Sequence, residues 1–464
     1  MNDQNYHTIF NLVSDYESKS KDGSANFLDE KAFLQLVEFY NQEGHFNKSL
    51  EVIDHALNVH HYSSELYIRK AEILLELGME SEALEILDRA SVFSPAEDEI
   101  ILLKTEALIY LGAFLEAEIY IEQLKGHYEN DIQSKAFFLE GLLYEQTGQN
   151  ERMYYSLIES LRYDSSNQDA LDHFWLCIEL EKKYKESIEF FEELLSSNAY
   201  SSQIWFYLGH CHAYLGHYES AIEAYEYSFI IDPEFEDGYR ECGELCFETK
   251  NYSKALEVLL QLDKMSEPDP EVLMRIGQSF QGLEQYEQSR EFLLKASVIN
   301  PHDDEIFFSL GEGYALTEDW DIAIKYLKRA IYIEDGREEY FAALAQVYAQ
   351  TKNRAKALWA FGKAVSIAPE DVQYWLLFIT FLLDSQDYKK AFHIIEEAED
   401  ATLSTEITYA KAVCLILMGK RKEAKYWLGE ALLEEYDLHT ILFELNPLLK
   451  DDSEVIEMIE QYCY

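Results

Sequence analysis

Small residues recur along this chain at a constant interval of 34 residues. The interval separates four glycines and continues at an alanine: Gly209, Gly243, Gly277, Gly311 and Ala345. Twelve residues after each of these stands a second small residue: Ala221, Ala255, Ser289, Ala323 and Ala357. A glycine inside a helix costs about 1 kcal/mol relative to alanine, so its recurrence indicates a contact that a larger side chain would force apart. The spacing therefore predicts pairs of closely packed helices, repeated many times.

Large apolar residues and occasional prolines complete each copy of the repeat. In the copy that contains Gly209, Trp205 and Leu208 are large, and Pro233 stands near the end. A proline at such a place stops one helix and admits the next, because it lacks an N–H and has a fixed φ. The chain has only 7 Pro and 19 Gly among 464 residues, which favours long helices over strands. We therefore expect an all-α protein whose unit is two antiparallel helices joined by a turn.

Two copies show the pattern most fully. One reads Trp205, Leu208, Gly209, His212, Ala221, Tyr225 and Pro233; the other reads Phe341, Leu344, Ala345, Tyr348, Ala357, Phe361, Ala364 and Pro369. The pattern resembles that of the tetratricopeptide-repeat (TPR) family, although His212 stands where that family usually has tyrosine. The resemblance implies a right-handed superhelical solenoid of about twelve helix-turn-helix repeats. The predicted units start near Glu30, Ser64, Asp98, Ser134, Gln168, Ser202, Glu236, Pro270, Asp304, Glu338, Val372 and Thr405.

This register divides the chain into three regions. Residues 1–29 are expected to form an N-terminal helix and a flexible segment, and residues 30–438 the tandem repeats. Residues 439–464 are expected to form C-terminal capping helices, because the last unit of a solenoid otherwise exposes apolar surface. The register is least secure around residues 126–131, where the third unit needs two extra residues. No room remains for a catalytic domain.

The formal charge of −50 comes from 88 acidic and 38 basic residues. It opposes the counterion release by which proteins hold nucleic acid, and it repels anionic lipid. The charge would attract basic partners. The alternative is that it serves only to keep a long solenoid soluble. Neither a secretory signal nor an apolar stretch long enough to span a membrane is found, so a cytoplasmic protein is expected.

The TPR resemblance also indicates where a partner could bind. In that family the second, fifth and ninth residues of each unit face an inner groove lined by the first helices. Here the fifth positions are mostly apolar, the second positions are largely acidic, and five of the twelve ninth positions are glutamate. The groove candidates are Phe138, Asp172, Phe206, His210, Arg240, Glu244, Met274, Gln278, Phe308 and Glu312.

Our hypothesis gives these candidates different roles. Four of them would be apolar anchors for a partner segment: Phe138, Phe206, Met274 and Phe308. Glu244 and Glu312 would select basic residues between the anchors. The alternative is that these side chains only pack neighbouring helices, because apolar stripes at helical spacing usually belong to a core.

Motifs of catalysis and cofactor binding are not found in the sequence. It contains no Gly-rich phosphate loop, GxSxG elbow or HExxH pattern, so we expect neither an enzyme nor a cofactor. Cys242 and Cys246, with Cys211 and His210 one unit earlier, could in principle hold zinc. The two cysteines occupy large-residue core positions, so packing is favoured and no metal site is predicted.

The segment Trp375–Leu383 is apolar nearly all round its predicted helix and must be covered on every side. Either the C-terminal cap or a second protein could cover it.

The sequence therefore predicts an intracellular protein-interaction scaffold. Its partner would be a protein or peptide segment with apolar and basic residues; nucleic acid and membrane insertion are not expected, and self-association is left open. The alternative is a regulatory sensor whose superhelix closes around a small peptide or ligand.

Overall fold

A computed structural model describes residues 3–20 and 28–462, and these residues form helices, turns and loops without a strand. The chain divides into two compact units, Met1–Phe235 and Glu236–Tyr464. The first unit contains α1 (Asp3–Ser20), α2 (Glu30–Gln42), α3 (Phe46–Val59), α4 (Ser64–Glu76), α5 (Glu80–Phe93), α6 (Asp98–Tyr110), α7 (Phe114–Lys125), α8 (Asn130–Gln146), α9 (Asn150–Tyr163), α10 (Gln168–Glu181), α11 (Tyr184–Ser197), α12 (Ser202–Tyr214) and α13 (Tyr218–Ile231).

The second unit has the same kind of elements and ends in shorter helices. It contains α14 (Glu236–Glu248), α15 (Tyr252–Met265), α16 (Pro270–Gly282), α17 (Tyr286–Ile299), α18 (Asp304–Leu316), α19 (Trp320–Ile333), α20 (Glu338–Gln350), α21 (Arg354–Ile367), α22 (Val372–Asp384), α23 (Tyr388–Ala401), α24 (Thr405–Leu417), α25 (Arg421–Glu434), the 3-10 helix η2 (Tyr436–Thr440), α26 (Ile441–Leu445), the 3-10 helix η3 (Pro447–Asp451) and α27 (Ser453–Gln461).

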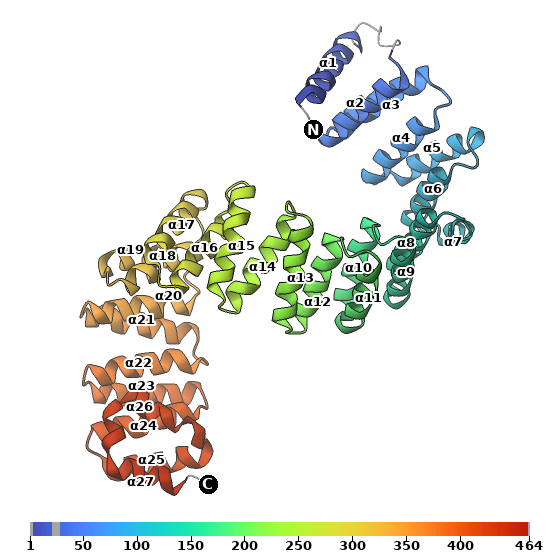
Figure 1. Cartoon of the computed structure of the whole chain (residues 1–464). Helices are drawn as coiled ribbons and strands as arrows, with labels where there is room; N and C mark the ends of the chain where they lie inside the picture. Colours follow the sequence, from blue (N-terminus) through green and yellow to red (C-terminus); the bar gives the residue numbers. More distant parts are fainter. Residues whose placement is uncertain (1–2, 21–27, 463–464) are drawn as a thin grey trace. The chain divides into compact units, whose positions relative to one another are not determined.

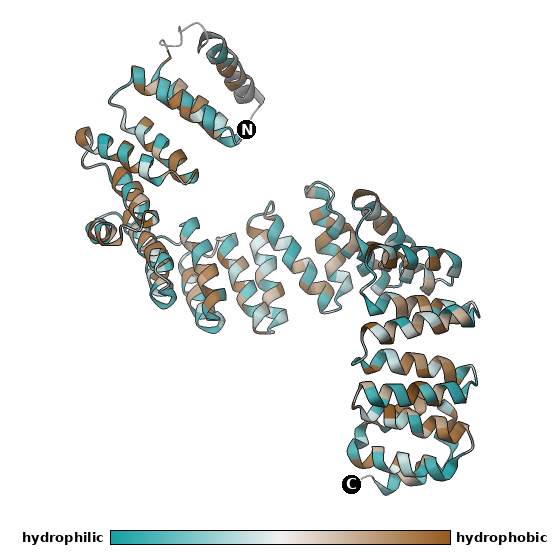
Figure 2. Cartoon of the chain, turned by 180° about the vertical axis from the view of Figure 1, so that it is seen from behind, coloured by the Kyte–Doolittle hydropathy of each residue, from teal (hydrophilic) through white to brown (hydrophobic). Residues whose placement is uncertain are grey.

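Consecutive helices pair into hairpins within each unit (Figure 1). From α2 to α25, each even-numbered helix is the first of its hairpin and packs against the odd-numbered helix that follows. Both hydrophobic and hydrophilic residues are seen along these helices in Figure 2, as expected for helices that bury one face. The predicted all-α solenoid of helix pairs is therefore confirmed. The right-handed superhelix, the number of units and the boundaries of the three predicted regions stay predictions.

The turn inside each hairpin contains one residue in the left-handed conformation, at the same position of every predicted unit. The fifteenth residue of every predicted unit has a positive φ. At six of these positions the residue is glycine, which adopts this conformation without steric cost, as at Gly78 (φ 68°). At the other six a longer side chain adopts it, as at Lys182 (φ 55°). The left-handed residue turns the chain back after the first helix, so its recurrence places each hairpin in the same frame.

The recurring glycines lie where the two helices of a hairpin approach each other closely. A Cβ atom on Gly311 would lie 2.7 Å from Cγ of Leu327 and 3.2 Å from its backbone nitrogen. A Cβ on Gly243 would lie 2.3 Å from Cδ2 of Leu259. In both hairpins the glycine is on the first helix, and its neighbour stands 16 residues later on the second. The prediction that these glycines permit close packing is confirmed.

One boundary differs from the predicted register. Helix α8 begins at Asn130, four residues before the predicted unit start at Ser134. Helix α7 ends at Lys125, and α8 gains an additional first turn from Asn130 that buries Ile132. The frame is restored by the next turn, where Gly148 has a φ of 69°.

The apolar helix α22 is covered from within the chain. Trp375, Ile379 and Leu382 are buried in one core cluster, and Phe381 packs partly buried against it. Helices α20, α21, α23 and α24 contact α22 and supply this cover. Neighbouring hairpins therefore cover most of this apolar surface. The sequence had suggested the C-terminal cap or a second protein instead. In the described part of the chain, no helix combines the length and the apolar composition needed to cross a membrane.

Candidate functional site

A hollow of about 580 Å³ opens on the first helices of the second unit. Its lining comes mainly from α16, α18 and α20, with residues of α14, α15 and α19 beside them. Three predicted groove residues meet here: Gln278, Phe308 and Glu312. The hollow combines aromatic surface, including Trp320, with side-chain amides and a carboxylate. Its lining contains no lysine or arginine.

Glu312 is the carboxylate in this hollow. It is exposed to solvent, and within the described residues it has no hydrogen-bond or ion-pair partner. The protein around it still displaces much of the bulk water, and this partial burial raises its pKa. An incoming ammonium or guanidinium group would relieve that cost, because it would stabilise the charged form.

The amides at the hollow are held in place by hydrogen bonds between hairpins. Gln281 donates from Nε2 to the backbone oxygen of Ser309 at 2.7 Å. Gly313 makes room for this bond, because a Cβ there would lie 2.4 Å from Nε2 of Gln281. Gln278 donates to the Ser309 hydroxyl at 2.8 Å. The polar wall is therefore fixed before any partner arrives, which lowers the entropy cost of binding.

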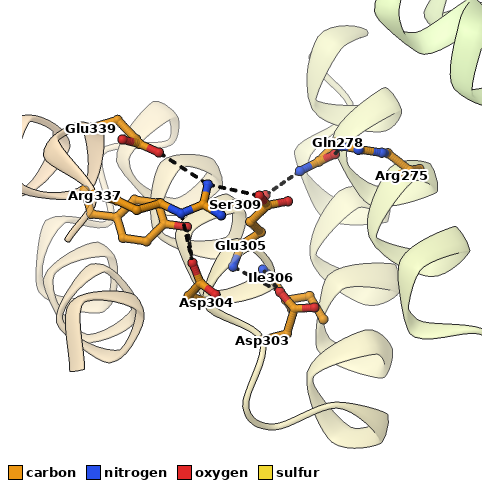
Figure 3. A network of polar contacts seen from close by, with 10 residues as sticks. Arg275, Gln278, Asp303, Asp304, Glu305, Ile306, Ser309, Arg337 and Glu339 are labelled. Atoms are coloured by element: carbon orange, nitrogen blue, oxygen red, sulfur yellow. Dashed lines mark hydrogen bonds and ion pairs between the residues drawn. The ribbon is translucent and has the colours of Figure 1, made fainter. Parts of the chain in front are cut away.

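A chain of polar contacts links the first helices of successive hairpins (Figure 3). Arg275 on α16 donates to Gln278, which in turn donates to Ser309 on α18. At the start of α20, Arg337 forms ion pairs with Glu305 at 3.1 Å and with Glu339 at 3.5 Å. These contacts tie α16, α18 and α20 together and position the hollow that they line.

Three other predicted groove residues of this unit are already engaged. Glu244 forms an ion pair with Arg275 at 2.8 Å, and Arg240 forms one with Asp269 at 2.9 Å. Met274 is only 4% exposed and belongs to a core cluster. Their availability to a partner is therefore lower than that of Phe308 or Glu312.

In the first unit, the predicted residues form a ladder of rings. His210 stacks on Trp175 with ring centres 5.0 Å apart and meets Phe206 edge to face at 4.4 Å. Phe138 meets His173 edge to face at 5.2 Å. Burial lowers the pKa of His210 to about 4, so its ring is neutral at pH 7.

Asp172 lies at the same ladder and accepts a hydrogen bond of 2.6 Å from the hydroxyl of Tyr207. The four predicted residues of this unit therefore contact neighbouring helices, in agreement with the packing alternative.

A second hollow, of about 750 Å³, lies on α2, α4 and α6 of the first unit. The ninth-position residues Glu38, Glu72 and Glu106 line it. Burial raises the pKa of Glu106 to about 7, and the negative charges of Asp169 and Glu72 act in the same direction. Ninth-position residues thus line the hollows of both units.

The candidate list from the sequence omitted several lining residues of the first hollow. Gln281 and Gln350 lie one helical turn beyond the ninth-position residues Gln278 and Gln346, on the same stripe. That spacing could have found them. Trp320 starts the second helix α19, and no groove column includes it. Among the described residues, no group of three or more His, Cys, Asp or Glu side chains is arranged to hold a metal ion.

Two family models described as tetratricopeptide repeat match parts of the chain. One matches residues 202–235, and the other matches residues 270–303 and 338–371. The search of curated proteins found no match.

Solved structures of helical-repeat proteins are similar at low identity. YrrB, described as a TPR protein with an unusual peptide-binding site, is 21% identical, with a TM-score of 0.34 over 40% of this chain and 94% of its own. The APC/C assembly Cut9–Hcn1 is 13% identical, with a TM-score of 0.37 over 94% and 93%. A tetratricopeptide repeat protein from Parabacteroides merdae is 16% identical, with a TM-score of 0.38 over 53% and 98%. These TM-scores are too low to carry a functional inference.

The matched segments begin at Ser202, Pro270 and Glu338, where the 34-residue spacing places the starts of units. Each segment spans one hairpin of the structure, from α12 to α13, α16 to α17 and α20 to α21. Sequence spacing, helix pairs and family models therefore agree that the chain contains tetratricopeptide repeats at these three hairpins.

Proposed function

We propose that this protein is an interaction scaffold that binds a segment of a partner protein across the first helices of its second unit. The observation that supports this most strongly is the hollow around Phe308 and Glu312, where an apolar surface lies beside a carboxylate that has no partner among the described residues. Repeat proteins present such surfaces along their helices, and each hairpin contributes part of the lining.

The chemistry of the hollow defines the partner segment. Phe308, stacked on Tyr340 with ring centres 4.6 Å apart, and Trp320 offer contact for an apolar side chain. The amides of Gln346 and Gln350 can pair with the backbone of an extended segment. Glu312 would bind a lysine or arginine placed near the apolar residue. The negative charge of the whole chain would speed the approach of such a segment, at a rate that falls with added salt.

The test is the affinity of the full chain for short labelled peptides that combine leucine or phenylalanine with lysine. We expect Glu312→Gln to weaken binding about fivefold to tenfold, because an uncharged amide cannot pair with lysine in a partly dehydrated site. Phe308→Ala should weaken binding independently of the lysine. Fluorescence anisotropy at low and moderate salt measures both effects.

Glu257→Gln is the matched control. Glu257 lies on the second helix α15, is exposed, and does not line the hollow, so this variant loses the same charge without touching the site. Equal affinities for the Glu312→Gln and Glu257→Gln proteins would contradict the proposal. The small-ligand sensor would instead be supported if no peptide binds and the native protein crosslinks to no macromolecule.

A further inference from the structure

Two neighbouring second helices of the second unit are basic, although the chain as a whole carries a formal charge of −50. Helix α19 has three basic residues and one acidic residue, and α21 has three basic residues and no acidic one. The other second helices of this unit carry at least as many acidic as basic residues. Positive charge is therefore concentrated on two neighbouring second helices, α19 and α21. The hollow is lined chiefly by the first helices α16, α18 and α20.

Five cations of these two helices, together with one tryptophan, make up what we call the basic patch: Lys325, Lys328, Arg329, Lys356, Trp359 and Lys363. Lys328 of α19 and Lys356 of α21 lie over the same ring, that of Tyr348 on α20, at 5.9 Å and 5.4 Å from its centre. Lys328 and Lys356 therefore lie near each other across α20.

The cations of the basic patch are available to a partner. Lys325, Lys328, Lys356 and Lys363 are all exposed, and within residues 3–20 and 28–462 none of their ammonium groups forms an ion pair. Arg329 donates only to a backbone oxygen, that of Pro301, at 3.1 Å. The chain has more than twice as many acidic as basic residues, so carboxylate partners for a lysine are abundant. These four lysines nevertheless form no ion pair with a carboxylate in the described part of the chain.

Apolar surface accompanies the charge. Trp359 is 52% exposed and lies between Lys356 and Lys363 on one stripe of α21, at helical spacings of three and four. Tyr332 on α19 is 80% exposed, next to Arg329, whose guanidinium lies 5.5 Å from its ring centre. Exposed aromatic residues beside unpaired cations are features of interaction surfaces.

We infer that the basic patch binds a second partner, an acidic protein segment in which Asp or Glu residues flank an apolar side chain. Carboxylates complement the unpaired lysines, and the apolar residue complements Trp359. A polyanion such as RNA fits less well, because its larger charge meets stronger repulsion from the rest of the chain. The chain would then hold two partners of opposite charge, the basic one at the hollow and the acidic one at the basic patch.

The experiment measures binding of the full chain to a short labelled peptide of Glu, Asp and Leu by fluorescence anisotropy. We expect binding that weakens with added salt, and a loss of about fivefold or more in the Lys356→Gln/Lys363→Gln variant. Lys389→Gln/Lys390→Gln is the matched control, because it removes the same charge from α23, outside the patch, and should change the affinity less than twofold. Glu312→Gln should leave this binding unchanged, which separates the inference from the proposed function.

Several results would overturn the inference. They are equal losses in the two lysine variants, undiminished binding of a peptide with Gln and Asn in place of Glu and Asp, or tighter binding of single-stranded RNA or phosphatidylglycerol vesicles than of the acidic peptide. Sedimentation velocity tests a second copy of the chain as the occupant. Self-association that disappears in Lys356→Gln/Lys363→Gln would also overturn it.

Discussion

Replacing Gly311 with valine is expected to lower the free energy of unfolding by about 2 kcal/mol. Valine would place a branched side chain where even a Cβ lies 2.7 Å from Cγ of Leu327 and 3.2 Å from its backbone nitrogen. Leu327 is fully buried, so helix α19 itself would have to move away from α18. The gain in helix propensity over glycine is a few tenths of a kcal/mol and does not offset this overpacking.

Gly362 provides the control for this prediction. It lies inside helix α21, and a Cβ there would meet nothing within 4 Å. Gly362→Ala should therefore raise stability by about 0.5–1 kcal/mol through helix propensity alone. Urea unfolding followed by circular dichroism measures both variants; unfolding midpoints are compared, because arrays of repeats depart from two-state behaviour. A Gly311→Val protein as stable as the wild type would contradict the packing role of the glycines.

Replacing Glu106 with glutamine is expected to stabilise the protein at neutral and alkaline pH. Its pKa is about 7 in the folded state against an ordinary value of 4.5, so the folded chain binds a proton more tightly than the unfolded chain. The wild type therefore loses stability as the pH rises from about 4.5 to about 7, whereas glutamine does not titrate.

The expected gain for Glu106→Gln is about 1–2 kcal/mol near pH 8, less than the full pKa shift would imply because the side chain is partly exposed. The gain should vanish near pH 4, where the carboxyl is neutral in both states. Urea unfolding at these two pH values tests the prediction. A stabilisation of equal size at both would show that the effect comes from packing and not from the charge.

Spacing alone predicted much of the fold. The interval between Gly277 and Gly311 predicted where each hairpin begins. Each of these glycines contacts a buried residue 16 positions later in the same hairpin, so the contact recurs wherever the sequence pattern recurs. The early start of α8 was not predicted, because no periodic residue marks where the turn around Gly126 ends.

The candidate site was predicted less completely. Gln278, Phe308 and Glu312 meet at one hollow, as their equivalent positions on first helices suggest. Glu244 stands at the same ninth position as Glu312, but Arg275 from the next hairpin pairs with it. Whether a carboxylate has such a partner depends on contacts between neighbouring hairpins. The residue types at equivalent positions of the repeat do not predict these contacts. For the same reason they did not predict how the rings pack around His210.

A partner segment that lies across the first helices of the second unit would slow amide hydrogen exchange in those helices. Hydrogen–deuterium exchange of the full chain, with and without a saturating peptide of leucine and lysine, measures this effect. We expect slower exchange in α16, α18 and α20, and no change in α17, α19 and α21 apart from the residues next to Trp320. Protection confined to the second helices, or none in α18 when the peptide is bound, would rule out the proposed site.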